Sequence, residues 1–164
     1  MKLRQLEIRL QKIQGFASPS PALEQYMTPA PLAARFLFHA AMNGDITGCR
    51  VCDLGCGTGM LSVGAALLGA EVTAVDCDPA ALSAARQNAE TFGVDITFCE
   101  RVIDGSGFEQ TFDTVLMNPP FGAQKEHADR PFIDESLGIA PVCYGIFNAG
   151  TIPFLTAYLL GRAD

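Results

Sequence analysis

Several features typical of secreted, metal-binding or repeat proteins are scarce or absent in this sequence. The N-terminal stretch MKLRQLEIRLQKIQGF is amphipathic and contains no apolar segment of the length that a signal peptide needs. Only two histidines occur, and His39 lies within an apolar helical pattern that favours a structural role. There are no internal repeats and no low-complexity tract. The 164 residues therefore fit one domain that is large enough to bury a core.

The six cysteines do not form a metal-binding pattern. Cys49 and Cys52 make one CxxC, but they span the start of an expected strand, where positions three apart point to opposite faces. Because no second CxxC exists, the sequence predicts no metal site. The cysteines lie mostly in apolar runs, which is typical of buried thiols in a reducing compartment, so we expect a cytoplasmic protein.

Positive charge is in deficit, with a formal net charge of -7. This argues mildly against a nucleic-acid partner, because phosphate contacts dominate such affinities. The first twelve residues nevertheless carry four basic side chains against one acidic one. A basic helix on an acidic body could meet RNA, although charge alone favours a solvated helix face.

A long segment, residues 138–160, contains no charged residue and is long enough to span a bilayer. Pro141, Asn148 and Pro153 interrupt any single helix there. We therefore expect a strand in PVCYGIF, then a helix in TIPFLTAYLLG that begins near Thr151, and no membrane association.

Hydrophobic periodicity predicts alternating strands and helices along most of the chain. One helix is expected over Leu3–Ile13, and a second runs through LAARFLFHAAM after Thr28 and Pro29, beyond the proline-rich connector FASPSPALEQYMTPAP. From residue 50, strands are expected in RVCDL, EVTAV, DITFCE, FDTVLM and PVCYGIF, with helices between them. This alternation predicts an α/β fold with a doubly wound parallel sheet. We expect a single domain over 1–164, with a helical segment over 1–45 and the sheet core over 46–164.

A glycine-rich loop, DLGCGTG, follows the first expected strand. Its glycines, Gly55, Gly57 and Gly59, lie where the backbone can approach a ligand closely, although a packing role explains a lone glycine loop almost as well. Met60 stands where a dinucleotide fingerprint needs its third glycine. The loop therefore does not fit a pyrophosphate site.

Acidic residues near this loop indicate the kind of cofactor. Asp76 ends the second expected strand nineteen residues after Gly57, near the distance at which an acid binds the ribose hydroxyls of an adenosine. Asp78 precedes Pro79 and is expected to cap the next helix. Ribose recognition without a pyrophosphate site indicates S-adenosylmethionine. Asp53 is a candidate for its ammonium group, directly or through water; the alternative is a structural aspartate bonded to the loop backbone.

The motif NPPF ends the fourth expected strand, because its prolines cannot donate ladder hydrogen bonds. This strand should end beside the first one, so the motif should face the methyl donor. The Asn118 side-chain oxygen and the Pro119 carbonyl can accept both N–H groups of a planar amino group, which directs the nitrogen lone pair toward the methyl. Pro119 and Pro120 hold these acceptors rigidly, and Phe121 offers a stacking face. No charged general base is required.

Together these motifs resemble class I S-adenosylmethionine-dependent methyltransferases that act on planar amino groups. The resemblance is carried by DLGCGTGMLSVGAALLGA, VDCDPAAL and FDTVLMNPPFG. The stretch LEQYMTPAPLAARFL is similar to the methyltransferase-like protein 5 group of archaea and eukaryotes, which makes N6-methyladenosine in small-subunit ribosomal RNA. The likeness covers nearly the whole chain and implies a Rossmann-like fold and an RNA substrate.

The resemblance also implies which residues contact the cofactor. The N-terminal segment would act as a lid through Gln25, Tyr26 and Thr28. The sheet core would contribute Gly55, Gly57, Thr58, Gly59, Met60, Asp76 and Cys77. After the third strand the family has an aspartate near the adenine; here Glu100 stands in that place, followed by Arg101, and a glutamate reaches further.

Two kinds of association are expected. The family implies a small zinc-binding activator protein that extends the sheet edge near DITFCE. Class I members usually add a sixth and a seventh strand, whereas this sequence ends at Asp164, as in a truncated form or an unusually short member. We therefore expect PVCYGIF (Pro141 to Phe147) to be an edge strand that promotes self-association.

Three alternatives to RNA adenine methylation stay open at this point. The same motif suits DNA adenine, guanine N2 and a protein glutamine amide. A short chain could also bind S-adenosylmethionine without turnover. A nicotinamide oxidoreductase is disfavoured by the GxGxG spacing and by the lack of a proton relay around His39 or His127.

Overall fold

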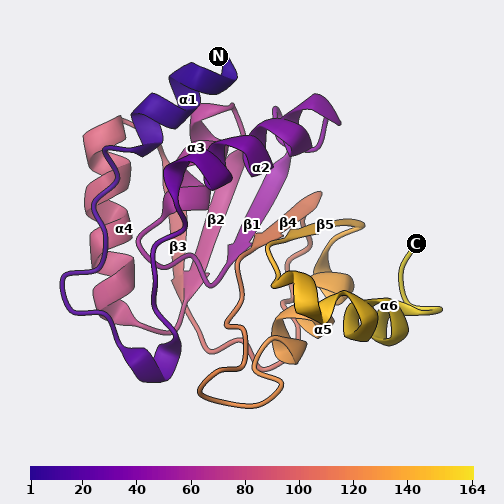
Figure 1. Ribbon diagram of the computed structural model, residues 1–164. Coiled ribbons are helices and arrows are strands. Elements are labelled where there is room, and N and C mark those ends of the chain that lie inside the picture. Colours follow the sequence, from indigo (N-terminus) through magenta and orange to yellow (C-terminus); the bar gives the residue numbers. More distant parts are fainter.

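The computed structural model describes all 164 residues and is built around a five-stranded parallel sheet (Figure 1). The strands are β1 (Arg50–Leu54), β2 (Glu71–Asp76), β3 (Ile96–Glu100), β4 (Thr114–Met117) and β5 (Val142–Gly145). Their order is β3-β2-β1-β4-β5, and every neighbouring pair is parallel. The predicted α/β fold with a doubly wound parallel sheet is confirmed.

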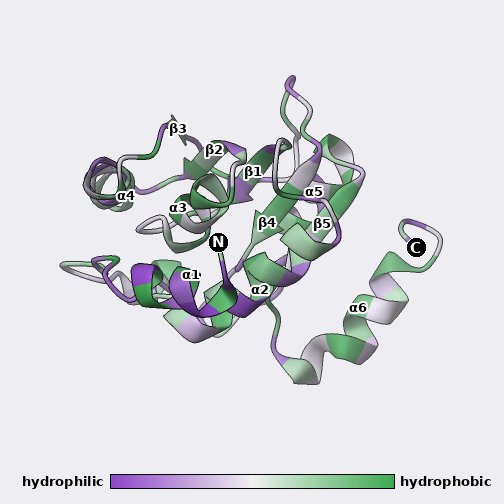
Figure 2. Ribbon diagram, turned by 90° about the horizontal axis from the view of Figure 1, so that it is seen from above, coloured by the Kyte–Doolittle hydropathy of each residue, from purple (hydrophilic) through white to green (hydrophobic).

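Helices cover both faces of this sheet (Figure 2). One face carries α1 (Leu3–Leu10), α2 (Ala30–Met42), α3 (Met60–Leu67) and α4 (Pro79–Phe92). The other face carries α5 (Arg130–Ile139), and α6 (Ile152–Leu159) follows β5. Two 3₁₀ turns complete the structure, at Pro21–Leu23 and Ala149–Thr151.

The alternation of side chains along the strands divides the core into two main clusters. On β1, Val51 joins the cluster formed by α1, α2 and α3, whereas Cys52 and Leu54 join the cluster formed with α5. On β4, Leu116 faces the first cluster and Val115 the second. Because both faces of the central strands are covered, these strands read as continuous apolar runs.

Most expected elements are present, with different ends. The first helix stops at Leu10 rather than Ile13, and buried Ile13 continues the apolar pattern in a turn. The last helix begins at Ile152, after a 3₁₀ turn in which the Asn148 side chain accepts the backbone N–H of Gly150. The expected cap on α4 is confirmed, because Asp78 accepts the backbone N–H of Ala80 at 2.9 Å.

The C-terminal helix α6 lies at the periphery of the molecule and is largely apolar (Figure 2). Its Leu155, Tyr158 and Leu159 side chains pack against the core cluster to which α5 belongs. None of the residues of α6 is buried, and Ile152 is 60% exposed. Its main polar attachment is Tyr158, whose hydroxyl donates to the Asp134 carboxylate on α5 at 2.8 Å. No helix combines the length and the apolar character that crossing a bilayer requires.

Candidate functional site

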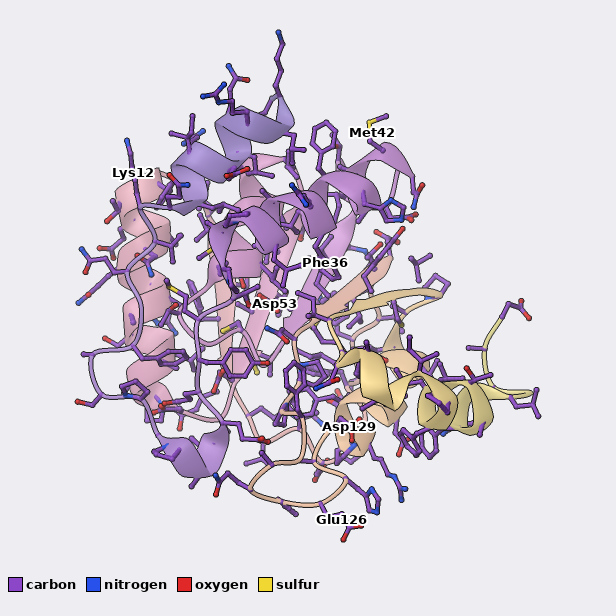
Figure 3. The ribbon with its side chains drawn as sticks, in the orientation of Figure 1. Lys12, Phe36, Met42, Asp53, Glu126 and Asp129 are labelled. Carbon is purple, nitrogen blue, oxygen red and sulfur yellow. The ribbon has the colours of Figure 1, made fainter.

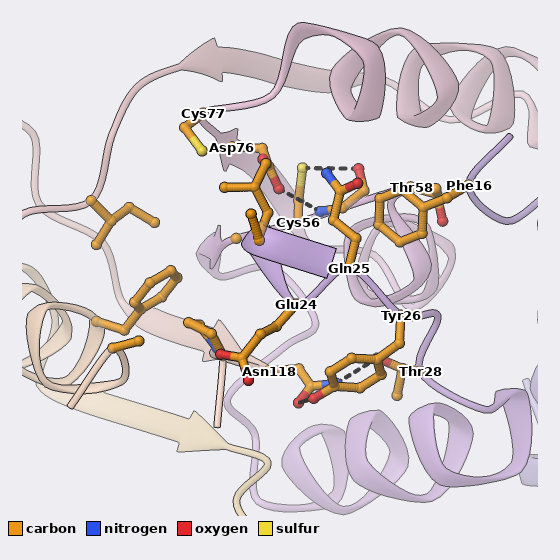
Figure 4. A pocket seen from close by; sticks show the side chains of 18 of the residues that line it. Phe16, Glu24, Gln25, Tyr26, Thr28, Cys56, Thr58, Asp76, Cys77 and Asn118 are labelled. Atoms are coloured by element: carbon orange, nitrogen blue, oxygen red, sulfur yellow. Dashed lines mark hydrogen bonds between the residues drawn. The ribbon is translucent and has the colours of Figure 1, made fainter. Parts of the chain in front are cut away.

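A cavity of about 280 Å³ lies at the carboxyl ends of the central strands (Figure 4). This is the place where open α/β sheets bind ligands, because the loops after the strands diverge there. Its walls come from the N-terminal connector, the glycine loop, the end of β2, residues 101–103, the NPPF motif and residues 125–132. The motifs singled out in the sequence therefore meet around one space.

The glycine loop needs glycine for both conformation and packing. Gly55, Gly57 and Gly59 all have positive φ angles, of 74°, 54° and 89°. A Cβ on Gly55 would lie 2.8 Å from the Phe132 ring, and one on Gly57 would lie 2.9 Å from the Phe16 ring. Both reasons for a glycine at these positions therefore apply. Gly55 and Gly57 line the cavity, where a ligand can approach the backbone, and they also leave room for the two rings that pack on the loop.

Asp76, the last residue of β2, faces the cavity and fastens the glycine loop (Figure 4). Its Oδ2 accepts the backbone N–H of Gly57 at 2.8 Å, and its Oδ1 accepts that of Asp78 at 3.0 Å. Burial raises the pKa of this carboxyl, while the two backbone N–H groups oppose the shift. An adenosine ribose would therefore meet a preorganised acceptor.

Asp53 lies in the interior of the molecule rather than on the cavity wall (Figure 3). It is 1% exposed, and its Oδ2 accepts the Ser62 hydroxyl of α3 at 2.5 Å. Burial raises the pKa of Asp53 to about 7, and the nearby Asp76 carboxylate adds to this shift. The geometry favours a structural role for Asp53, as a hydrogen-bond partner of Ser62. Asp53 does not touch the cavity, so it can act on a bound cation only through long-range electrostatics.

The side-chain amide of Asn118, directly after β4, is held at both ends by the N-terminal connector. The Tyr26 hydroxyl donates to its Oδ1 at 3.1 Å, and its Nδ2 donates to Thr28 Oγ1 at 2.8 Å. The rings of Tyr26 and Phe121 have centroids 5.6 Å apart, tilted by 42°. The acceptor motif and the N-terminal segment thus form one hydrogen-bonded unit (Figure 4).

We call residues 20–28 the strap, because they cross the cavity and are fastened on both sides. On the acceptor side, the Glu24 carboxylate accepts the backbone N–H groups of Gly122 at 3.1 Å and Ala123 at 2.8 Å. On the ribose side, Gln25 Nε2 donates to Asp78 Oδ2 at 2.5 Å. Residues 22–28 all line the cavity, as expected for a lid segment.

Arg101 lines the cavity, but its guanidinium is engaged elsewhere. It pairs with the fully buried Glu135 of α5 at 2.7 Å and lies 4.1 Å above the Phe108 ring. The following residues, Val102 and Ile103, form an apolar part of the wall. Arg101 therefore holds the loop after β3 in place.

The cavity gathers most of the predicted site residues. Those that line it are Gln25, Tyr26, Thr28, Gly55, Gly57, Thr58, Met60, Asp76, Cys77, Arg101, Asn118 and Pro120. Those outside the lining are Asp53, Gly59, Glu100, Pro119 and Phe121. Glu100 ends β3 and is exposed, Gly59 is the N-cap residue of α3, and Pro119 is buried.

Sequence reasoning missed several wall residues. Glu24 belongs to the quoted stretch LEQYMTPAPLAARFL but was given no role, and its left-handed backbone, with a φ of 50°, is visible only in the structure. Phe16, Lys125, His127 and Phe132 carry no motif signal. Phe16, Lys125 and His127 reach the cavity from loops, and Phe132 reaches it from the first turn of α5.

Comparison with known proteins agrees with this geometry. The family model described as the methyltransferase small domain matches residues 32–137. The rRNA N(6)-adenosine-methyltransferase Mettl5 of Drosophila melanogaster is 42% identical over 147 residues, which cover 85% of this chain and 69% of that protein. An uncharacterized protein of Methanocaldococcus jannaschii is 38% identical over 97% of this chain and 77% of its own length.

A solved structure shows the same architecture. It is that of a Pyrococcus horikoshii protein described as a candidate RNA methyltransferase, with a TM-score of 0.91 and 39% identity. The alignment covers 98% of this chain and 81% of that one. The chain therefore belongs to the methyltransferase small domain family, in the branch that contains the Mettl5 proteins.

Proposed function

We propose that this chain transfers a methyl group from S-adenosylmethionine to N6 of adenosine in RNA, with small-subunit ribosomal RNA as the substrate. The observation that carries the proposal is the position of the Asn118 amide at the end of β4, on the wall of the cavity that the glycine loop and Asp76 also line. The rRNA N(6)-adenosine-methyltransferase activity named for the fly relative supports the choice of acceptor. The six free cysteines support a cytoplasmic location.

The chemistry of the cavity wall fits this cofactor. Asp76 would accept the ribose hydroxyls, and the backbone around Gly55 and Gly57 would approach the methionine end. Val102 and Ile103 would cover the adenine with apolar surface. When bound, S-adenosylmethionine supplies an electrophilic methyl group on a sulfonium. Buried Asp53 and partly buried Asp76 are acids without a basic partner, and they favour such a cation electrostatically.

The acceptor side needs hydrogen-bond acceptors rather than a charged base. An exocyclic amino nitrogen is a poor nucleophile because its lone pair is delocalised into the ring. We assign Asn118 Oδ1 and the Pro119 carbonyl to its two N–H groups, which direct the lone pair toward the methyl. Pro119 and Pro120 limit the motion of these acceptors. Phe121, 40% exposed beside the cavity, offers its face to the base.

Partner contacts can be proposed at two places. Lys125 and His127 line the cavity and are exposed, so they suit the phosphates next to a target nucleotide. The outer edge of β3 has no neighbouring strand, which supports the docking of a small zinc-binding activator by strand addition. Co-purification with such an activator, and its loss on substitution of Thr97 by Pro in β3, tests the second contact.

The decisive experiment is transfer of labelled methyl onto total RNA, DNA and protein, followed by nucleoside and amino-acid analysis. We expect label in RNA as N6-methyladenosine. Asn118→Ala should bind the cofactor normally and lose roughly a hundredfold in turnover, and Phe121→Ala should raise the KM for RNA. Label in DNA, guanine or glutamine would overturn the substrate assignment. Cofactor binding without any transfer would identify a non-catalytic binding module.

A further inference from the structure

The strap makes two hydrogen bonds to a single side chain, that of Asn118. Thr28 lies at the opposite end of the amide from Tyr26 and is only 7% exposed, so water does not compete for its hydroxyl. Tyr26 is 43% exposed and sits at the cavity rim. The amide is thus anchored by one buried and one accessible hydroxyl (Figure 4).

This anchoring matters because the terminal torsion of asparagine has no sharp preferred angle. An amide held at neither end would sweep its oxygen through a wide arc, and a displacement of about 1 Å in a catalytic group can cost about a hundredfold in rate. With both ends bonded, the amide plane is fixed. The Tyr26 hydroxyl uses one lone pair of Asn118 Oδ1 and leaves the other for an incoming N–H group.

Other strap contacts keep these two hydroxyls in register with the acceptor motif. The Tyr26 ring lies against Phe121, so one residue touches both ends of NPPF. Glu24 binds the backbone immediately after the motif and adopts a left-handed conformation to do so. A non-glycine residue held in that region carries conformational strain, which the surrounding contacts must offset.

We propose that Tyr26 and Thr28 are positioning residues that fix the Asn118 amide for methyl transfer, and that Glu24 holds the strap in the required register. The inference rests on the proposed function and deepens it. It gives the strap hydroxyls a role on the acceptor side, in place of the cofactor contacts that the family resemblance implies for these two residues.

Removal of either hydroxyl tests the proposal in the full chain. Thr28→Val and Tyr26→Phe keep the side-chain shapes, and each should lower kcat roughly tenfold while the affinity for S-adenosylmethionine stays within about twofold. Thr28→Ser should restore most of the rate, because it returns the hydroxyl. Matched controls are Thr156→Val and Tyr158→Phe on α6, whose hydroxyls bond away from the cavity. An unchanged kcat in both test variants, or a loss of cofactor affinity as large as the loss of rate, would overturn the assignment.

A double-mutant cycle separates positioning from general damage to the fold. If Thr28 acts through Asn118, Thr28→Val should cause no further loss of rate in the Asn118→Ala background. A full additional loss in that background would show that Thr28 acts on something else.

NMR spectroscopy tests whether Thr28 holds the Asn118 amide, and this test does not depend on RNA being the substrate. In the nitrogen-15-labelled protein, the two Nδ2 protons of Asn118 should give separate signals with slowed solvent exchange, assigned by their absence in Asn118→Ala. Thr28→Val should shift them and speed their exchange, whereas Thr156→Val should not. Unchanged Asn118 signals in Thr28→Val would refute the anchoring. A wild-type protein that shows the signals but methylates no RNA would instead refute the proposed function.

Discussion

At the scale of single residues, Asp76 combines two tasks that affinity and stability measurements can separate. It lines the cavity and also accepts two backbone N–H groups, so its removal affects both the ligand and the loop. Asp76→Ala should weaken binding of S-adenosylmethionine by about 1.5–3 kcal/mol, as expected for charge-assisted hydrogen bonds. Calorimetry on the folded variant checks this, with Asp113→Ala as the control, because that aspartate pairs with Arg50 and lies outside the cavity lining. Unchanged affinity in Asp76→Ala would leave the ribose assignment without support.

Asp53 gives a prediction about pH, because it is a buried acid without a cationic partner. Its pKa is about 7 in the folded protein against 3.8 as its ordinary value, so the folded state holds the proton more tightly than the unfolded state does. The free energy of unfolding should therefore fall as pH rises from about 4 to about 7, with a slope from this group of up to about 1.4 kcal/mol per pH unit.

Asp53→Asn removes the titrating carboxyl of Asp53 and keeps that of Asp76, so it separates their contributions to the pH dependence of the free energy of unfolding. The variant should show a flatter pH dependence and a higher free energy of unfolding at pH 8 than the wild type, both measured by urea unfolding without ligand. Bound S-adenosylmethionine, a cation, should reduce the wild-type slope. Parallel pH profiles for the two proteins would contradict the assignment of the raised pKa to Asp53.

At the scale of elements, the pair Arg101–Glu135 joins the loop after β3 to helix α5. Glu135 is fully buried and also accepts the backbone N–H of Gly105 at 3.2 Å, so it fixes the loop that carries Val102 and Ile103. Glu135→Gln leaves the guanidinium without its counter-charge and should lower the free energy of unfolding by about 3–5 kcal/mol.

The matched control is Asp113→Asn, which weakens the exposed pair with Arg50 and should cost less than about 1 kcal/mol. Urea unfolding of both variants gives the comparison, and calorimetry should show weaker cofactor binding only for Glu135→Gln. Equal costs for the buried and the exposed pair would contradict this account of the loop.

The elements also show what the sequence could and could not predict. The strands, the glycine loop and the capping role of Asp78 follow from local pattern, because periodicity and turn chemistry act over a few residues. The ion pair of Glu135 and the contact of Glu24 with Gly122 join segments that are distant in sequence, and no local rule specifies them. Asp53 is an intermediate case: strand alternation places it on the same face as Val51, but only the structure shows its bond to Ser62.

At the scale of the whole molecule, the sheet has two unpaired edges, at β3 and at β5. The residues of β5 are half-buried, and the apolar helix α6 that follows this strand in the chain has no buried residue. We predict that the 164-residue chain self-associates through the β5 edge, because unpaired N–H and C=O groups next to apolar surface favour strand pairing.

Light scattering over a range of concentrations measures this association. Val142→Lys on β5 should reduce it, because a charge on an edge strand disfavours pairing, whereas Thr97→Lys on β3 should leave it unchanged. A monodisperse monomer of the unmodified chain at all concentrations would refute the prediction.

The strap has a consequence for the order in which the protein can be made. Tyr26 and Asn118 lie 92 residues apart in the chain, and Glu24 and Gly122 lie 98 apart. During synthesis the strap therefore leaves the ribosome long before the residues that fasten it exist. Helices α1 and α2 can pack on α3 as soon as that helix emerges, but Asn118 gains its anchors only after β4 has been translated. The acceptor side is thus among the last parts of the molecule to assemble, although the strap residues that hold it are among the first to be translated.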